Sequence, residues 1–281
     1  MNITTIIPIH EYNDTISTFL TNAVESIIKQ ERLPLTDGGV NDIPLIALVF
    51  PPAIEEGIVG FRDALIRKYA NIITFKNFLL IKNEGETDFQ SQINCGVNNI
   101  ETEYFSILEL DDEYSNTYFK NALLYIKSFT DVDIFLTMMI ETNDKNEGIK
   151  LTNEVVWSQQ FVGENGEMGY LNLNSLKQYT DFKISGAVIK KSEYLTIGGL
   201  KSKIKLTFNY EFLLRALTQA AKVMVISKIG YKHLAVREGS LFDGYGKDMS
   251  MEERKFWFET AKKEANVVND RDIDMSTLVQ K

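Results

Sequence analysis

Short apolar runs alternate with segments of helical periodicity over the first 110 residues of the chain. The apolar runs cover residues 3–9, 43–50, 77–82 and 104–110, and helical spacing lies between them at residues 16–28, 61–69 and 86–98. Strands that are apolar along their whole length are typical of a parallel sheet with both faces covered by helices. We therefore predict an α/β fold, in which ligands bind beyond the carboxyl ends of the strands.

The alternation becomes less regular after residue 110. Further helices are predicted at residues 116–129, 210–221 and from residue 250, and further strands at 132–140, 182–189 and 222–229. Residues 141–169 are polar and rich in turn residues, which indicates an excursion from the core. Ser250 and Glu253 have the spacing of a capping box at the start of the last helix.

The composition excludes several classes of protein. With 281 residues, 44% of them hydrophobic and 25% charged, the chain has enough apolar residues for a large core and is not a disordered segment. The longest apolar run, residues 134–140, is much shorter than the roughly 20 residues of a membrane-spanning helix. Cys95 is the only cysteine, so no internal disulfide can form.

Charge and the N-terminal segment indicate where the protein works. The segment MNITTIIPIHEYND has neither a basic flank nor a cleavage site of small residues, so we expect a cytoplasmic protein. The formal net charge of -9 argues against broad nonspecific binding to nucleic acids or to anionic membranes.

The fourth apolar run ends in the stretch FSILELDDEY, which contains the carboxylates Glu109, Asp111, Asp112 and Glu113. Like charges repel each other, and burial disfavours all of them, so the arrangement requires either a solvated helix start or a bound cation. Capping of the following helix by Asp111 or Asp112 is the simpler explanation. The acidic stretch alone leaves both explanations open.

Five segments resemble, in the same order, motifs of the family 2 glycosyltransferases of the GT-A fold. They are TTIIPIHEYND, AVESIIKQ, INCGVNNIETEYFSILELDDEY, SGAVIKKSEYLTIGGL and NYEFLLRA. The resemblance implies a GT-A-like, mostly parallel central sheet flanked by helices over residues 1–241, with a C-terminal helical appendage and tail over residues 242–281. It also implies an enzyme that transfers a sugar from a nucleoside diphosphate to an acceptor hydroxyl with inversion.

The resemblance also assigns roles to individual residues. A divalent cation neutralises the diphosphate as the sugar leaves, so Mn²⁺ or Mg²⁺ is the expected cofactor. Asp111 and Asp112 correspond to the metal-binding positions, and His233 to a third ligand. The implied donor, for which a UDP-sugar is our first choice, would be contacted by Pro8, His10, Asn13, Asn94, Glu109 and Arg237. Turn and capping chemistry would equally explain His10 and Asn13.

Some expected residues are absent. The family has an aspartate as catalytic base where this chain has Asn209, which cannot accept a proton. Glu211 is the nearest carboxylate and our predicted base, although it would be equally ordinary as a surface glutamate in a first helical turn. The aspartate that ends the family's second strand is also missing, and Ile93 replaces an arginine. Uridine specificity is therefore open, with Glu55 or Glu56 as a displaced substitute.

Three alternatives follow from these departures. Loss of catalysis would leave a nucleotide-binding module with the same fold, as Asn209 suggests. The acceptor could be a glycan or an anionic polymer such as DNA with a hydroxymethylated base, which would suit a cluster of lysines formed by Lys183, Lys190, Lys191, Lys201, Lys203 and Lys205. A nucleotidyltransferase is disfavoured because PIHEYND contains no glycine-rich, basic phosphate loop.

Overall fold

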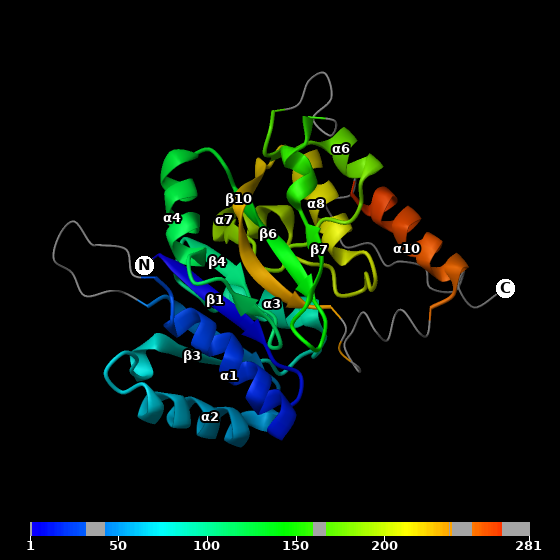
Figure 1. Cartoon of the computed structure of the whole chain (residues 1–281). Helices are drawn as coiled ribbons and strands as arrows, with labels where there is room; N and C mark the ends of the chain where they lie inside the picture. The colour runs from blue at the N-terminus through cyan, green and yellow to red at the C-terminus, as the bar shows by residue number, and fades with distance from the viewer. Residues whose placement is uncertain (1, 32–42, 160–166, 236, 238–248, 266–281) are drawn as a thin grey trace.

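The computed structural model describes residues 2–31, 43–159, 167–235, 237 and 249–265 (Figure 1). Within these residues, ten strands form one sheet in the order β3-β2-β1-β4-β9-β6-β10-β5, with β7 paired to β6 and β8 paired to β10. The six strands that run in the same direction are β1 (Ile3–Pro8), β2 (Leu45–Phe50), β3 (Phe78–Lys82), β4 (Tyr104–Ile107), β6 (Ile134–Thr142) and β10 (Val223–Leu234). The antiparallel ones are β5 (Glu113–Tyr114), β7 (Gly148–Thr152), β8 (Tyr170–Leu171) and β9 (Val188–Lys190). The predicted mostly parallel sheet is confirmed.

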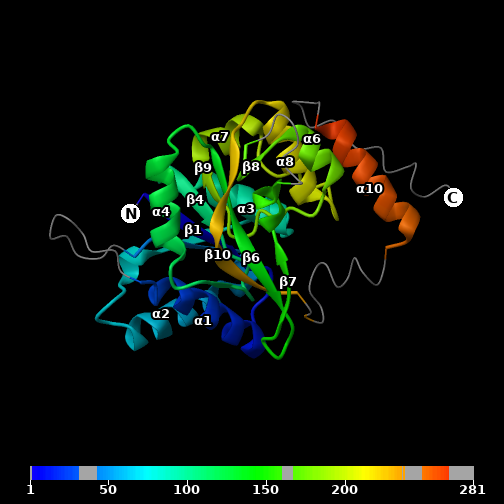
Figure 2. The same cartoon turned by 45° about the horizontal axis from the view of Figure 1, so that its top comes forward.

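Helices cover both faces of the sheet (Figure 2). One core cluster contains residues of α1 (Asp14–Ile28), α2 (Glu55–Lys68) and α4 (Tyr118–Ser128). The other contains residues of α3 (Phe89–Asn98), α7 (Lys191–Ile197), α8 (Phe208–Thr218), α6 (Leu173–Gln178) and α10 (Met251–Glu264). Along β1, Ile3 and Ile7 belong to the first cluster and Ile6 to the second, because successive strand side chains point to opposite faces.

The first half of the chain follows the predicted alternation closely. Asn13 caps α1, since its side-chain oxygen accepts a hydrogen bond from the Ile16 amide at 3.0 Å. The helix predicted from residue 61 begins earlier, at Glu55, where two acidic side chains occupy the first turn and favour a helix N-terminus.

The second half contains two errors of prediction. Most of the strand predicted at residues 182–189 is not a strand, because side chains of Asn153 and Asn209 accept hydrogen bonds from the amides of residues 183 and 184. Gly186, at φ 72°, then turns the chain before β9 begins. In contrast, β10 continues past residue 229 through two irregularities of register, so His233 lies on a strand instead of in a loop.

The C-terminal helix packs on the outside of α8 (Figures 1 and 2). Trp257 is completely buried there, and its carbonyl accepts a hydrogen bond from Thr207 Oγ1 at 3.0 Å. Ser250 caps the helix by accepting from the Glu253 amide at 3.1 Å. The boundary predicted after residue 241 lies outside the described residues and stays a prediction. None of the helices in the described ranges has the length and apolar character needed to cross a bilayer.

Candidate functional site

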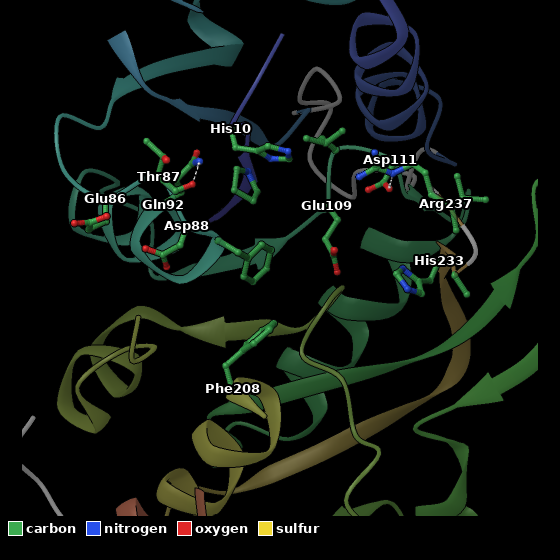
Figure 3. A pocket seen from close by; sticks show the side chains of 15 residues that line it. His10, Glu86, Thr87, Asp88, Gln92, Glu109, Asp111, Phe208, His233 and Arg237 are labelled. Atoms are coloured by element: carbon green, nitrogen blue, oxygen red, sulfur yellow. Dashed lines mark hydrogen bonds and ion pairs between the residues drawn. The ribbon is translucent and has the colours of Figure 1, made fainter. Parts of the chain in front are cut away.

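A pocket of about 560 Å³ opens at the carboxyl ends of β1, β4 and β10 (Figure 3). This is the edge at which parallel α/β sheets bind ligands. The start of α3 and the first residue of α8 complete its walls. Its lining comprises Pro8, His10, Glu86, Thr87, Asp88, Phe89, Gln92, Glu109, Leu110, Asp111, Phe208, His233, Leu234, Ala235 and Arg237.

Three side chains at this edge converge in the way that metal ligands do. Glu109, Asp112 and His233 each offer one ligand atom, and these atoms lie within 4.8 Å of one another. We call these three residues the candidate metal site. Asp112 is 1% exposed; its Oδ1 accepts from the Leu234 amide at 2.8 Å, and its Oδ2 lies 2.8 Å from His233 Nδ1. Because Nδ1 faces Asp112, Nε2 is the nitrogen of His233 left for another ligand.

The carboxylates of this region destabilise one another's charged forms. Burial, followed by the charge of Asp112, raises the pKa of Glu109 to about 7. Burial and Asp112 also raise the pKa of Asp111, although Arg237 opposes the shift. Burial acts to lower the pKa of His233, but the Asp112 carboxylate outweighs it and raises this pKa to about 9. Because the ligand atoms are hard oxygens with one imidazole nitrogen, the residues fit a divalent cation that would relieve the repulsion.

Asp111 and Arg237 form an ion pair in the pocket wall, in which Arg237 Nε donates to Asp111 Oδ2 at 2.5 Å (Figure 3). Asp111, which was predicted to bind the metal, is next to Asp112 in the chain and feels its charge, but it is not one of the three residues of the candidate metal site. Arg237 lines the pocket, as do Pro8 and His10.

Two predicted donor-binding residues lie outside the pocket lining. Asn13 is the cap of α1. Asn94 ties α3 to the loop after α7, since its Oδ1 accepts from the Leu200 amide at 3.0 Å and from the Tyr194 hydroxyl at 2.7 Å. Two residues on, a Cβ atom at Gly96 would lie 2.8 Å from Ile6 Cγ2, so only glycine lets α3 pack this closely on the sheet. The Asn-x-Gly motif thus has a packing function here.

The predicted catalytic pair also lies away from this pocket. Glu211 is completely buried, and Arg215 donates to its two carboxylate oxygens at 2.7 and 2.9 Å. A carboxylate in this environment does not suit a general base, because no substrate can reach it. Asn209 accepts from the Ile184 amide at 3.3 Å and lines a separate pocket of about 240 Å³. Phe208, the first residue of α8, is the one that reaches the main pocket.

Other predicted contacts are likewise engaged elsewhere. Glu55 pairs with Lys82 at 3.2 Å on the surface, and neither Glu55 nor Glu56 lines the pocket. In the lysine cluster, Lys201 is 8% exposed and donates to Glu264 at 2.9 Å, while Lys191 donates to the Ile100 carbonyl. These two lysines hold the fold together and do not present a binding face.

Several functional candidates were missed in the sequence. Gln92 joins β1 to α3, since its side chain accepts from the Ile9 amide at 3.0 Å and donates to the Thr87 carbonyl at 2.9 Å. Gln92 and Phe208 directly precede two of the positions, 93 and 209, at which the chain departs from the family pattern, and these departures were a signal that could have drawn attention to both residues. Ser185 donates to Glu109 at 2.5 Å and begins the quoted SGAVI segment. Nothing in the sequence marked Tyr231.

Comparison with known proteins identifies the fold. No protein-family model and no curated protein matches the sequence. Among solved structures, S. aureus TarS 1-349 in complex with UDP-GlcNAc matches 99% of this chain and 69% of its own, with 16% identity and a TM-score of 0.63. The mannosyltransferase PcManGT from Pyrobaculum calidifontis, in complex with GDP-Man and Mn²⁺, matches 99% and 78%, with 9% identity and a TM-score of 0.59. The predicted GT-A fold is confirmed.

Proposed function

We propose that this protein is a metal-dependent glycosyltransferase that moves a sugar from a nucleoside diphosphate to an acceptor hydroxyl. The observation that carries the proposal is the convergence of Glu109, Asp112 and His233 beside the pocket at the carboxyl edge of the sheet. Two proteins that share this fold bind UDP-GlcNAc, or GDP-Man with Mn²⁺. Both ligands contain the diphosphate that such a metal site would serve.

Each part of the pocket has a role in this proposal. A cation held by the candidate metal site would neutralise the charge that develops on the departing diphosphate. The mixed set of carboxylates and imidazole favours Mn²⁺ over Mg²⁺. Arg237 would contact diphosphate oxygens, while Pro8 and His10 at the end of β1 would contact the nucleoside. Phe89 and Phe208, with ring centroids 5.4 Å apart, provide an apolar wall for the sugar ring.

The acceptor proton needs a base other than Glu211. Outside the candidate metal site and the Asp111–Arg237 pair, the carboxylates of the pocket lining belong to Glu86 and Asp88. We assign the role to one of these two side chains: Asp88 caps α3 by accepting from the Ser91 amide at 2.9 Å, and Glu86 lies in the loop before it (Figure 3). A single displacement with this base would invert the anomeric centre.

Thermal-shift measurements with UDP-sugars and GDP-sugars, each with and without Mn²⁺, test the proposal. We expect stabilisation that requires both metal and nucleotide, followed by metal-dependent donor hydrolysis by the best-stabilising pair. Both effects should be lost in Asp112→Asn. Stabilisation by nucleotides without any dependence on metal would contradict the proposal.

A noncatalytic nucleotide-binding module is the second candidate. It is favoured by Asn209 in place of the family's base and by the complete engagement of Glu211 with Arg215. This module would show metal-dependent stabilisation by a nucleotide but no hydrolysis and no transfer to any acceptor. A DNA acceptor is less well supported, because Lys191 and Lys201 are committed to intramolecular contacts.

A further inference from the structure

A buried tyrosine lies directly behind the candidate metal site. Tyr231 is on β10, two residues before His233, and is completely buried. Its ring packs against Tyr114 in an edge arrangement, with centroids 5.8 Å apart. A Cβ atom at Gly186 would lie 2.5 Å from Tyr231 Cδ2, so the glycine of the SGAVI segment is required for this packing. The ring is thus held in one position.

The hydroxyl of Tyr231 connects two members of the candidate metal site. It accepts a hydrogen bond from the Glu109 amide at 3.0 Å. Burial, then the charges of Asp112 and Glu109 and a hydrogen bond to the Asp112 carboxylate, raise the pKa of Tyr231 well above its usual value. Because the hydroxyl oxygen accepts from an amide, its own O–H is left to donate a hydrogen bond, and the Asp112 carboxylate is the acceptor. The Tyr231 hydroxyl therefore holds the backbone of Glu109 and the side chain of Asp112 in a fixed relative position.

Ser185 restrains the same site from the side of β9. Its hydroxyl donates to Glu109 Oε1 at 2.5 Å and therefore orients the Glu109 carboxylate. Asp112 accepts a hydrogen bond from the Leu234 amide and lies against His233 Nδ1. Each residue of the candidate metal site is therefore hydrogen-bonded either to another residue of the site or to a residue outside it. Such partners orient metal ligands before the metal binds and reduce the entropy that is lost on binding.

We propose that Tyr231 and Ser185 are positioning residues for the metal site, which hold Asp112 and Glu109 in the arrangement that binds the cation. The inference rests on the proposed function. It also explains the SGAVI segment, because Ser185 orients a ligand and Gly186 makes room for the ring of Tyr231.

The test measures Mn²⁺ affinity from the electron paramagnetic resonance signal of free Mn²⁺, without nucleotide or substrate. We expect Tyr231→Phe and Ser185→Ala each to raise the Kd for Mn²⁺ roughly 10- to 100-fold. Tyr194→Phe is the matched control for the tyrosine, since Tyr194 is equally buried but its hydroxyl donates to Asn94 Oδ1 at 2.7 Å, and neither residue lines the pocket. Ser106→Ala is the control for the serine, since Ser106 is buried and bonds Thr5 and Tyr114. Neither control should change the affinity.

The outcomes separate this inference from the proposed function. If wild type binds Mn²⁺ and the two variants bind it as tightly, or lose no more affinity than their controls, the positioning role is wrong and the metal site stands. If the wild-type protein does not bind Mn²⁺ even in the presence of a nucleoside diphosphate, the proposed function and this inference both fail. Circular dichroism checks that each variant is folded. If Tyr231→Phe does not fold, the comparison of Ser185→Ala with its control decides whether the positioning role is correct.

Discussion

Two groups of buried and half-buried carboxylates in this molecule differ in how far cations of the chain balance their charge. In the first, which we call the α8 ion cluster, Glu211 is bonded by Arg215 and lies 3.6 Å from Lys201, which also bonds Glu264. In the described part of the chain, the two cations of this cluster match its two anions. In the second, at the pocket, three carboxylates at positions 109, 111 and 112 face one arginine and one histidine among the residues that the structure describes.

The difference shows how to separate structural from functional acids. A buried carboxylate that is matched within the chain holds elements together, as Glu211 does inside α8. Carboxylates that exceed their cations and border a pocket destabilise the ligand-free protein and gain from a cation supplied from solution. Sequence position alone suggested the reverse assignment for Glu211.

The largest effect is expected in the α8 ion cluster. Glu211→Gln leaves Arg215 buried without its counter-charge, so the free energy of unfolding should fall by about 3–5 kcal/mol. Urea denaturation measures the loss. Glu259→Gln is the control, because Glu259 has a side chain 52% exposed and an ordinary surface pair with Lys262. Equal losses in the two variants would mean that Glu211 is not the central anion of the cluster.

The pocket should respond in its ligand affinity more than in its stability. Asp112→Asn is expected to raise the Kd for Mn²⁺ by about 100-fold, which corresponds to about 2.8 kcal/mol. The metal-free variant should lose less stability than Glu211→Gln does, because the substitution also removes repulsion from Glu109. Calorimetric titration and urea denaturation measure the two quantities. A reversed order of the two stability losses would break the comparison.

A smaller effect is expected at the edge of the α8 ion cluster. Lys201→Gln removes the cation that joins α8 to α10, while Arg215 still neutralises Glu211, so we expect a loss of about 1.5 kcal/mol. Hydrogen exchange should become faster in α10 before it does so in α8. Unchanged exchange in α10 would show that Trp257 and its neighbours hold this helix without help from the ion cluster.

The smallest effect is expected at a surface network on the opposite face. Burial acts to raise the pKa of Glu25. The hydrogen bonds that Lys29 and Lys68 donate to its carboxylate outweigh this effect and lower the pKa to about 2. A lowered folded-state pKa stabilises the protein above the unfolded pKa and loses this effect as the pH falls towards 2. Glu25→Gln should therefore cost about 0.5 kcal/mol at pH 7 and nothing near pH 2. Thermal unfolding at the two pH values checks this, and an equal cost at both would contradict it.

Local patterns in the sequence were sufficient to predict most of the fold but only part of the candidate site. The first four strands were predicted because each is a continuous apolar run. The acidic stretch after β4 was recognised because it too is a pattern of consecutive residues. The end of β10 was missed because Lys232 and His233 are polar and their pairing with β5 and β6 is a long-range property. The burial of Glu211 was missed because it depends on Arg215 and Lys201, whose positions only the folded chain defines.

Gly96 determines a dimension of the pocket from outside it. The helix that carries Asp88 and Gln92 to the pocket rests on β1 and β2 at this glycine, where an added Cβ atom would meet Ile6 and Val49 at 2.8 and 3.0 Å. A single methyl group there would act as a spacer between helix and sheet and would shift the first turn of α3 away from Pro8. The width of the pocket is therefore set by a contact that no ligand touches, and, under the proposed function, variants with an altered preference for donor size should be sought at this position.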